Sequence, residues 1–183
     1  MKAIEILVRE HDSILKMIEI TTTILNREDK TTINIDHVEK IIDFIKNFAD
    51  KYHHLKEEDI LFLEMEKHGM SRESGPIAVM LHEHNEGRNY IKLAVEGIEK
   101  FKQGNVAAFD QIQENLLAYC TLLTNHIAKE NNILYPMSER ILPAYVLSAM
   151  SDEFEKTNAT TLNNEYHDKY LKLVEDFSEI YMN

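Results

Sequence analysis

The chain has 183 residues, enough for one compact domain with a sizeable core or for a domain with an appended element. Its 20 basic and 32 acidic residues give a formal net charge of -12, which disfavours binding to nucleic acids and to anionic membranes. A single cysteine excludes an internal disulfide framework, and no apolar run reaches the roughly 18 residues of a membrane span. We therefore expect a cytoplasmic protein with no nucleic-acid or membrane partner.

The distribution of apolar residues predicts helices. Only five glycines and three prolines interrupt the chain, and long stretches are rich in Glu, Lys, Leu, Ile and Met. Apolar residues recur every three to four positions within four segments, at about 3–26, 36–67, 74–101 and 106–135. Short breaks such as His68-Gly69 separate these segments. The sequence thus predicts an all-α, up-down-up-down four-helix bundle.

The pattern is less regular beyond Pro136, which is expected to lie at the end of the fourth helix. One further helix is predicted from Pro143 to Lys156 and another from Leu162 to Met182, with a polar break at 157–161. We interpret these helices as an accessory layer. Residues 1–137 would then form the bundle, and residues 138–183 a C-terminal extension packed on it.

Each predicted bundle helix carries one histidine on its apolar stripe, namely His11, His53, His84 and His126. The two histidines of each helix pair are 42 residues apart, and equivalent histidines of the two pairs are 73 residues apart. Both halves contain the motif H-x-x-K-E-x-x-I-L-[F/Y], which begins at His53 and at His126. The chain is therefore an internal duplication of a helix pair.

The spacing HxxxE places an imidazole and a carboxylate one turn apart on one helix face, where both can reach a single metal site. It occurs four times, at His53/Glu57, His126/Glu130, His54/Glu58 and His82/Glu86. Only the first two pairs obey the 73-residue repeat and lie on the apolar stripe. We expect the other pairs to be solvated or to lie behind the ligands, with His54 at the surface. Two interpretations of Arg88 and of Glu10 or Glu83 stay open: they orient ligands from outside the site, or they are ordinary residues of a solvated helix face.

Counting donor atoms indicates a dinuclear metal site. Four imidazoles supply four nitrogens, and two carboxylates that bridge a metal pair supply four oxygens. With a solvent-derived oxo or hydroxo bridge, each metal is five-coordinate and keeps one position for a diatomic molecule or peroxide. These ligands suit two iron ions, with manganese and zinc as alternatives. The ferritin-like motif Glu-x-x-His and the zinc-protease motif H-E-x-x-H are both missing from the sequence.

At these residues the sequence resembles the hemerythrin-like, HHE cation-binding family, over roughly residues 1–137. The resemblance implies that the four histidines are terminal ligands and that Glu57 and Glu130 are bridging carboxylates. The oxygen-carrying hemerythrins have a second histidine where this chain has Arg88, and an aspartate where it has Asn131. The set of four histidines and two glutamates is more similar to the di-iron proteins implicated in iron–sulfur cluster repair.

Three functional hypotheses follow. The first is a non-haem di-iron protein that binds or reacts with dioxygen, peroxide or nitric oxide in sensing, scavenging or stress response. Peroxide decomposition or nitric oxide reduction would be its turnover, and whether it is an enzyme stays open here. The second is an iron-holding or iron-donating protein, for storage or iron–sulfur cluster repair, without catalysis of its own. The third is a structural zinc bundle with no open position.

Overall fold

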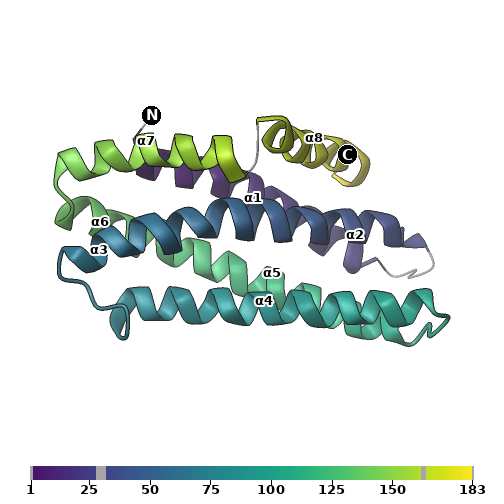
Figure 1. The fold of residues 1–183 in the computed structure, drawn as a ribbon. Coiled ribbons are helices and arrows are strands. Elements are labelled where there is room, and N and C mark those ends of the chain that lie inside the picture. Colours follow the sequence, from purple (N-terminus) through teal and green to yellow (C-terminus); the bar gives the residue numbers. More distant parts are fainter. Residues whose placement is uncertain (1, 28–31, 162–163, 183) are drawn as a thin grey trace.

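The computed structural model describes residues 2–27, 32–161 and 164–182, together with their side chains outside 158–166. These ranges contain helices and their connections and no strand (Figure 1). The predicted all-α class and helical bundle are confirmed. No helix among the described residues is long and apolar enough to cross a membrane.

Four long helical stretches form the bundle. Asn34 caps the second stretch, since its side-chain oxygen accepts a hydrogen bond from the Asp36 backbone N–H at 3.0 Å. Pro76 lies in the first turn of the third, and Gly104 follows that helix with a φ of 98°, a backbone conformation that favours glycine. The first stretch is α1 (Ala3–Leu25), and the third is α4 (Gly75–Lys102). The second consists of α2 (Ile35–Phe44), η2 (Ile45–His54), η3 (Glu57–Leu61) and α3 (Phe62–Lys67). The fourth consists of α5 (Ala108–Lys129), η4 (Glu130–Leu134) and α6 (Tyr135–Ile141).

The duplication extends to the backbone. The π-helical segments η3 and η4 begin at Glu57 and Glu130, which are equivalent positions of the two halves. A π turn carries an extra residue and changes the direction in which the following side chains point, and such turns are frequent at functional sites. In the fourth stretch η4 precedes Pro136, which has no backbone N–H to donate. The helix nevertheless continues to Ile141. The prediction that it ends near Pro136 is wrong.

Two further helices, α7 (Ala144–Thr161) and α8 (Asn164–Tyr181), lie along α1 and contact it (Figure 1). The predicted polar break at 157–161 is wrong, because α7 continues through this segment. The segment contains neither glycine nor proline, and each of its polar residues lowers helix stability by only about 0.5 kcal/mol relative to alanine. The predicted start of the last helix, Leu162, lies outside the described residues.

A layer of buried polar residues separates two apolar clusters. On α1, Leu7 belongs to one cluster and Ile14 to the other, with His11 between them. Side chains of α7 such as Phe154 join the first cluster, and side chains of α8 such as Tyr170 join the second. The polar layer is thus enclosed by apolar packing on both sides along the bundle axis.

Candidate metal centre

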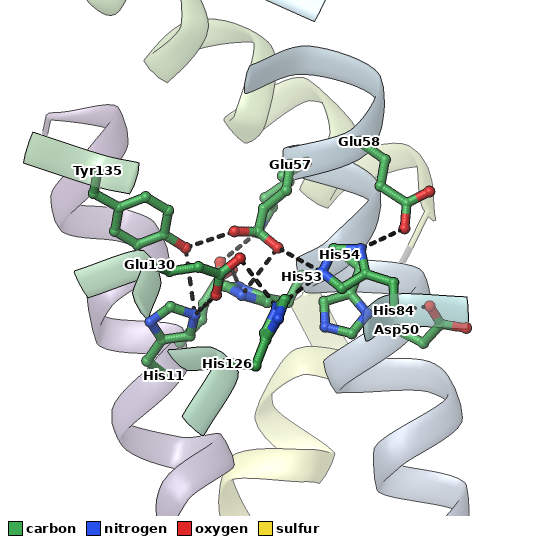
Figure 2. A network of polar contacts seen from close by, with 12 residues as sticks. His11, Asp50, His53, His54, Glu57, Glu58, His84, His126, Glu130 and Tyr135 are labelled. Atoms are coloured by element: carbon green, nitrogen blue, oxygen red, sulfur yellow. Dashed lines mark hydrogen bonds and ion pairs between the residues drawn. The ribbon is translucent and has the colours of Figure 1, made fainter. Parts of the chain in front are cut away.

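All six residues predicted as ligands lie in the buried polar layer, and each is at most 2% exposed (Figure 2). They come from all four bundle stretches, because the apolar stripes that carry them face the common core. The structure brings together His11, His53, Glu57, His84, His126 and Glu130. Their proximity fits the predicted site, and their role as ligands stays a prediction.

The layer contains two sets of four buried residues whose potential ligand atoms lie within 4.8 Å of one another. Glu57 belongs to both sets, which are His11, His53, Glu57 and Glu130, and His54, Glu57, His84 and His126. One oxygen of Glu57 lies 3.6 Å from the inner nitrogens of both His53 and His84. The oxygens of Glu130 lie 3.2 Å from His11 Nε2 and 3.1 Å from His126 Nε2. Each carboxylate therefore lies between histidines of the two halves.

Two histidines are oriented by glutamates of the preceding helix. His53 Nδ1 lies 2.9 Å from Glu10 Oε2, and His126 Nδ1 lies 2.9 Å from Glu83 Oε2. An N–H that donates to a carboxylate at Nδ1 leaves Nε2 as the unprotonated, metal-binding nitrogen. In both contacts the histidine and its partner occupy equivalent positions of the duplication.

The other two histidines are oriented by the residues that directly follow Glu57 and Glu130. His84 Nδ1 lies 2.7 Å from Glu58 Oε1, and His11 Nδ1 lies 2.8 Å from Asn131 Oδ1. Glu58 and Asn131 are equivalent in the repeat and directly follow Glu57 and Glu130. All four histidines thus present Nε2 to the interior and Nδ1 to a hydrogen-bond acceptor.

The lysine of the repeated motif supports this arrangement. Lys56 donates to Glu10, and Lys129 donates to Glu83, so each lysine holds the glutamate that orients the motif histidine. Lys56 is fully buried, and its ammonium group lies 3.4 Å from the centre of the Tyr52 ring. The lysine is part of the sequence motif, but only the packing of the helices shows that its partner is a glutamate of the preceding helix.

Four buried atoms of the described chain have no hydrogen-bond partner, namely His53 Nε2, Glu57 Oε2, Glu130 Oε1 and Glu130 Oε2. All belong to the candidate centre. Leaving a buried polar group without a partner costs about 1–3 kcal/mol, and more for a charged group. A cation bound among these atoms would satisfy them, so the donor set fits a metal.

The protonation of the layer also depends on its neighbours. Burial and the Glu130 carboxylate raise the pKa of Glu57 well above its ordinary value. Although burial opposes it, His126 and His11 hold the pKa of Glu130 well below the usual range. Burial also opposes protonation of His126, but Glu130 and Glu83 raise its pKa to about 9. Without a cation the layer therefore retains protons, and binding of metal would release them.

Tyr135 is a polar residue of the centre that sequence analysis did not single out. Its hydroxyl donates to Glu57 Oε1 at 2.7 Å and lies 3.3 Å from His11 Nε2. The equivalent residue of the first half is Phe62, whose ring stacks on His84 at 6.1 Å. The two halves therefore differ by one hydroxyl group, which lies beside the Glu57 carboxylate. The repeated motif ends in Phe in the first half and in Tyr in the second, and this difference was the sequence signal for Tyr135.

The expectation that His54 lies at the surface is wrong. Its side chain is only 5% exposed, and its ring stacks on His84 with 3.8 Å between the ring centres. His54 Nδ1 lies 3.3 Å from Asp50 Oδ1, which in turn accepts hydrogen bonds from Arg88 at 2.9 and 2.7 Å. The repeat contained the signal, because the equivalent residue is Ile127, which is buried at 2% exposure. His82, in contrast, is exposed as expected.

The fold and the enclosed His/Glu layer define a helical-bundle protein that can hold a metal ion. The model of the hemerythrin HHE cation-binding domain matches residues 2–138. The chain therefore belongs to the hemerythrin HHE cation-binding domain family. Comparisons with curated proteins and with solved structures gave no match.

Proposed function

We propose that this protein holds two iron ions and that the pair binds or reacts with dioxygen, peroxide or nitric oxide. The observation that carries the proposal is the position of Glu57 and Glu130, each of which lies between histidines of both halves and has buried oxygens without a hydrogen-bond partner. The other ligands would be His11, His53, His84 and His126, with a solvent-derived bridge between the ions.

The donor types support iron over softer metals. The buried layer offers imidazole nitrogens and carboxylate oxygens, and Cys120 belongs to neither ligand set. Such ligands suit iron, manganese and zinc, whereas thiolates favour copper(I), zinc or iron–sulfur clusters. An iron pair would supply redox chemistry toward a small oxidant, which zinc cannot do.

The surrounding residues would control that chemistry. Glu10, Glu58, Glu83 and Asn131 pair with the outer Nδ1 atoms of the histidines and so aim the inner Nε2 atoms at the metal position. The Tyr135 hydroxyl holds a proton 2.7 Å from Glu57. The apolar clusters on both sides of the layer limit the access of water to it. These features suit a centre that binds a small molecule without releasing its metal.

The third helical stretch differs from the expected pattern of the oxygen-carrying hemerythrins. Arg88 occupies the place of their second histidine on this helix, and its guanidinium donates to both Asp50 and Glu58. It is therefore a support for neighbouring groups and cannot replace an imidazole. His54 brings a fifth imidazole to the layer, but from the second helical stretch. These differences support a role other than dedicated oxygen carriage.

Anaerobic loading with ferrous iron tests this proposal. We expect two iron ions per chain by elemental analysis, and a near-ultraviolet charge-transfer absorption on addition of oxygen or peroxide. Full iron content with a silent spectrum would favour the alternative, an iron-holding or iron-donating protein without chemistry of its own. Failure to take up two iron ions would contradict both.

A further inference from the structure

The two halves of the metal centre differ in what lies beside them. A cavity of about 280 Å³ adjoins the half that contains His54, His84 and His126, and these three residues line its inner end. The apolar part of the remaining wall comes from Ile45, Ile91, Val95, Tyr119, Leu122 and Leu123, and the charged side chains of Lys46, Lys92 and Glu96 also line the cavity. The walls belong to η2, α4 and α5, so the cavity runs from the metal centre between three bundle helices.

The cavity lies where the two halves of the duplication have side chains of different size. Gly87 lines it, and the equivalent residue of the first half is Ile14, which is 2% exposed in the apolar core. A Cβ atom at Gly87 would lie 3.3 Å from Tyr119 Cε2 and 3.7 Å from Leu122 Cδ2. An isoleucine side chain here would therefore extend into space that the cavity now occupies.

Neighbouring positions show the same change from apolar to polar. Asp50 and Arg88 line the cavity, whereas their equivalents in the repeat are Leu123 and Leu15. Asp50 and Arg88 pair with each other, which places the polar groups near His54. Together these changes create a pocket with an apolar body and a polar inner end on one side of the centre.

The size of the pocket exceeds what a diatomic ligand needs. One water molecule occupies roughly 30 Å³ of liquid, and an engineered apolar cavity of roughly 150 Å³ binds benzene. A volume of about 280 Å³ therefore accommodates an organic molecule larger than benzene. The apolar wall would bind its hydrocarbon part, and the inner end would face its polar group.

We propose that this pocket binds an organic monocarboxylate whose carboxylate lies at the metal position of His54, His84 and His126. The inference rests on the proposed metal centre, because Asp50 and Glu83 at the inner end are already paired with Arg88 and Lys129, and a bound cation would supply the positive charge that holds the carboxylate. The hydrocarbon part of the ligand lies along Ile91, Tyr119 and Leu122. The opposite half, where Ile14 fills the equivalent place, has no such subsite.

The test uses full-length protein loaded with zinc, which is redox-silent, and isothermal titration with hexanoate and with acetate. Hexanoate should bind at least tenfold more tightly than acetate, since each buried methylene contributes about 0.8 kcal/mol of transfer free energy. Gly87→Ile should abolish this advantage while the zinc content stays at two per chain. Leu122→Phe, a change at a half-buried position of the wall, should reduce it, and Leu63→Phe, at an exposed site outside the pocket, should not.

Equal binding of hexanoate and acetate by the zinc-loaded protein would overturn the proposal. An undiminished advantage in both Gly87→Ile and Leu122→Phe would do the same. If Gly87→Ile does not fold, Leu122→Phe decides the question alone. Failure to bind two zinc ions would contradict the metal centre itself, and hexanoate binding to metal-free protein that matches the loaded form would contradict the placement of the carboxylate.

Discussion

Single residues decide which atoms the centre offers to a metal. Every histidine of the predicted set has an acceptor on Nδ1, so the nitrogen that faces the layer is Nε2. Glu57 and Glu130 are fully buried and carry oxygens without a hydrogen-bond partner. Because burial of such groups is costly without a compensating charge, stability and metal content should be linked at these positions.

We expect His53→Ala and Glu130→Ala to lower metal content and melting temperature together. Each change removes a donor from a ligand set that a bound metal would otherwise stabilise. Elemental analysis and calorimetry of the same preparations measure the two quantities. His82→Ala is the control, because this histidine is exposed and outside both ligand sets, and it should change neither. Equal loss of metal in the control would contradict the assignment.

The residues behind the ligands should tune metal affinity without abolishing it. Glu83→Ala removes the acceptor that orients His126, and substitutions of this kind typically cost about 10–100-fold in affinity. Competition with a chromophoric chelator measures the change. Glu19→Ala, on the exposed end of a surface ion pair with Lys16, is the matched control and should leave affinity within error. An unchanged affinity in Glu83→Ala would contradict the orienting role of Glu83.

At the scale of elements, α8 is held to the bundle by aromatic and polar contacts. His37 Nδ1 lies 2.5 Å from the Tyr181 hydroxyl, and the His37 ring stacks on Phe177 at 4.7 Å. The Tyr170 hydroxyl donates to Asp43 at 2.9 Å. These contacts join the middle and the C-terminal end of α8 to α2, so the attachment of the extension depends in part on His37.

The His37 contact predicts a pH dependence. Burial and Lys40 lower the pKa of His37 below its ordinary value of 6.5. The unfolded chain therefore binds this proton more readily than the folded protein, and the contribution of His37 to stability is present above pH 6.5 and lost as the pH falls below it. Urea unfolding between pH 7.5 and 5.5 measures the effect. His37→Phe should reduce the slope, and a slope identical in both proteins would exclude this contact as its source.

For the whole molecule, the extension completes both apolar clusters. Phe154 of α7 and Tyr170 of α8 are at most 1% exposed, and both lie against the bundle. Burial of one large apolar side chain contributes about 1.5–3 kcal/mol, so several such residues are comparable with the total stability of a domain of this size. We propose that residues 138–183 are a part of the same folding unit as residues 1–137.

Removal of the extension tests this proposal. A chain that ends after Ile141 should melt at a lower temperature than the full chain and aggregate more readily, because the α1 surface under α7 and α8 becomes exposed. Calorimetry and light scattering follow the two effects. Coexpression of residues 142–183 as a separate chain is the control and should restore part of the stability. A truncated chain with an unchanged melting temperature would show that the bundle is an independent domain.

Much of this protein could be predicted from the order of its residues. The helical period and the 73-residue repeat indicated the bundle and placed His11, His53, His84 and His126 on one interior, because both are local features of the chain. The repeat also distinguished Glu57 and Glu130 from other glutamates. The ends of helices were less certain, as the continuation through Pro136 shows.

Tertiary structure decided the features that depend on contacts between helices. The partners of the four Nδ1 atoms and the contact of the Tyr135 hydroxyl with Glu57 join residues that are distant in the chain. The pocket beside Gly87 depends on which side chains of three helices fail to fill a space. Sequence determined which residues face inward, since helical periodicity is local, whereas only packing decided which of them meet and where space remains.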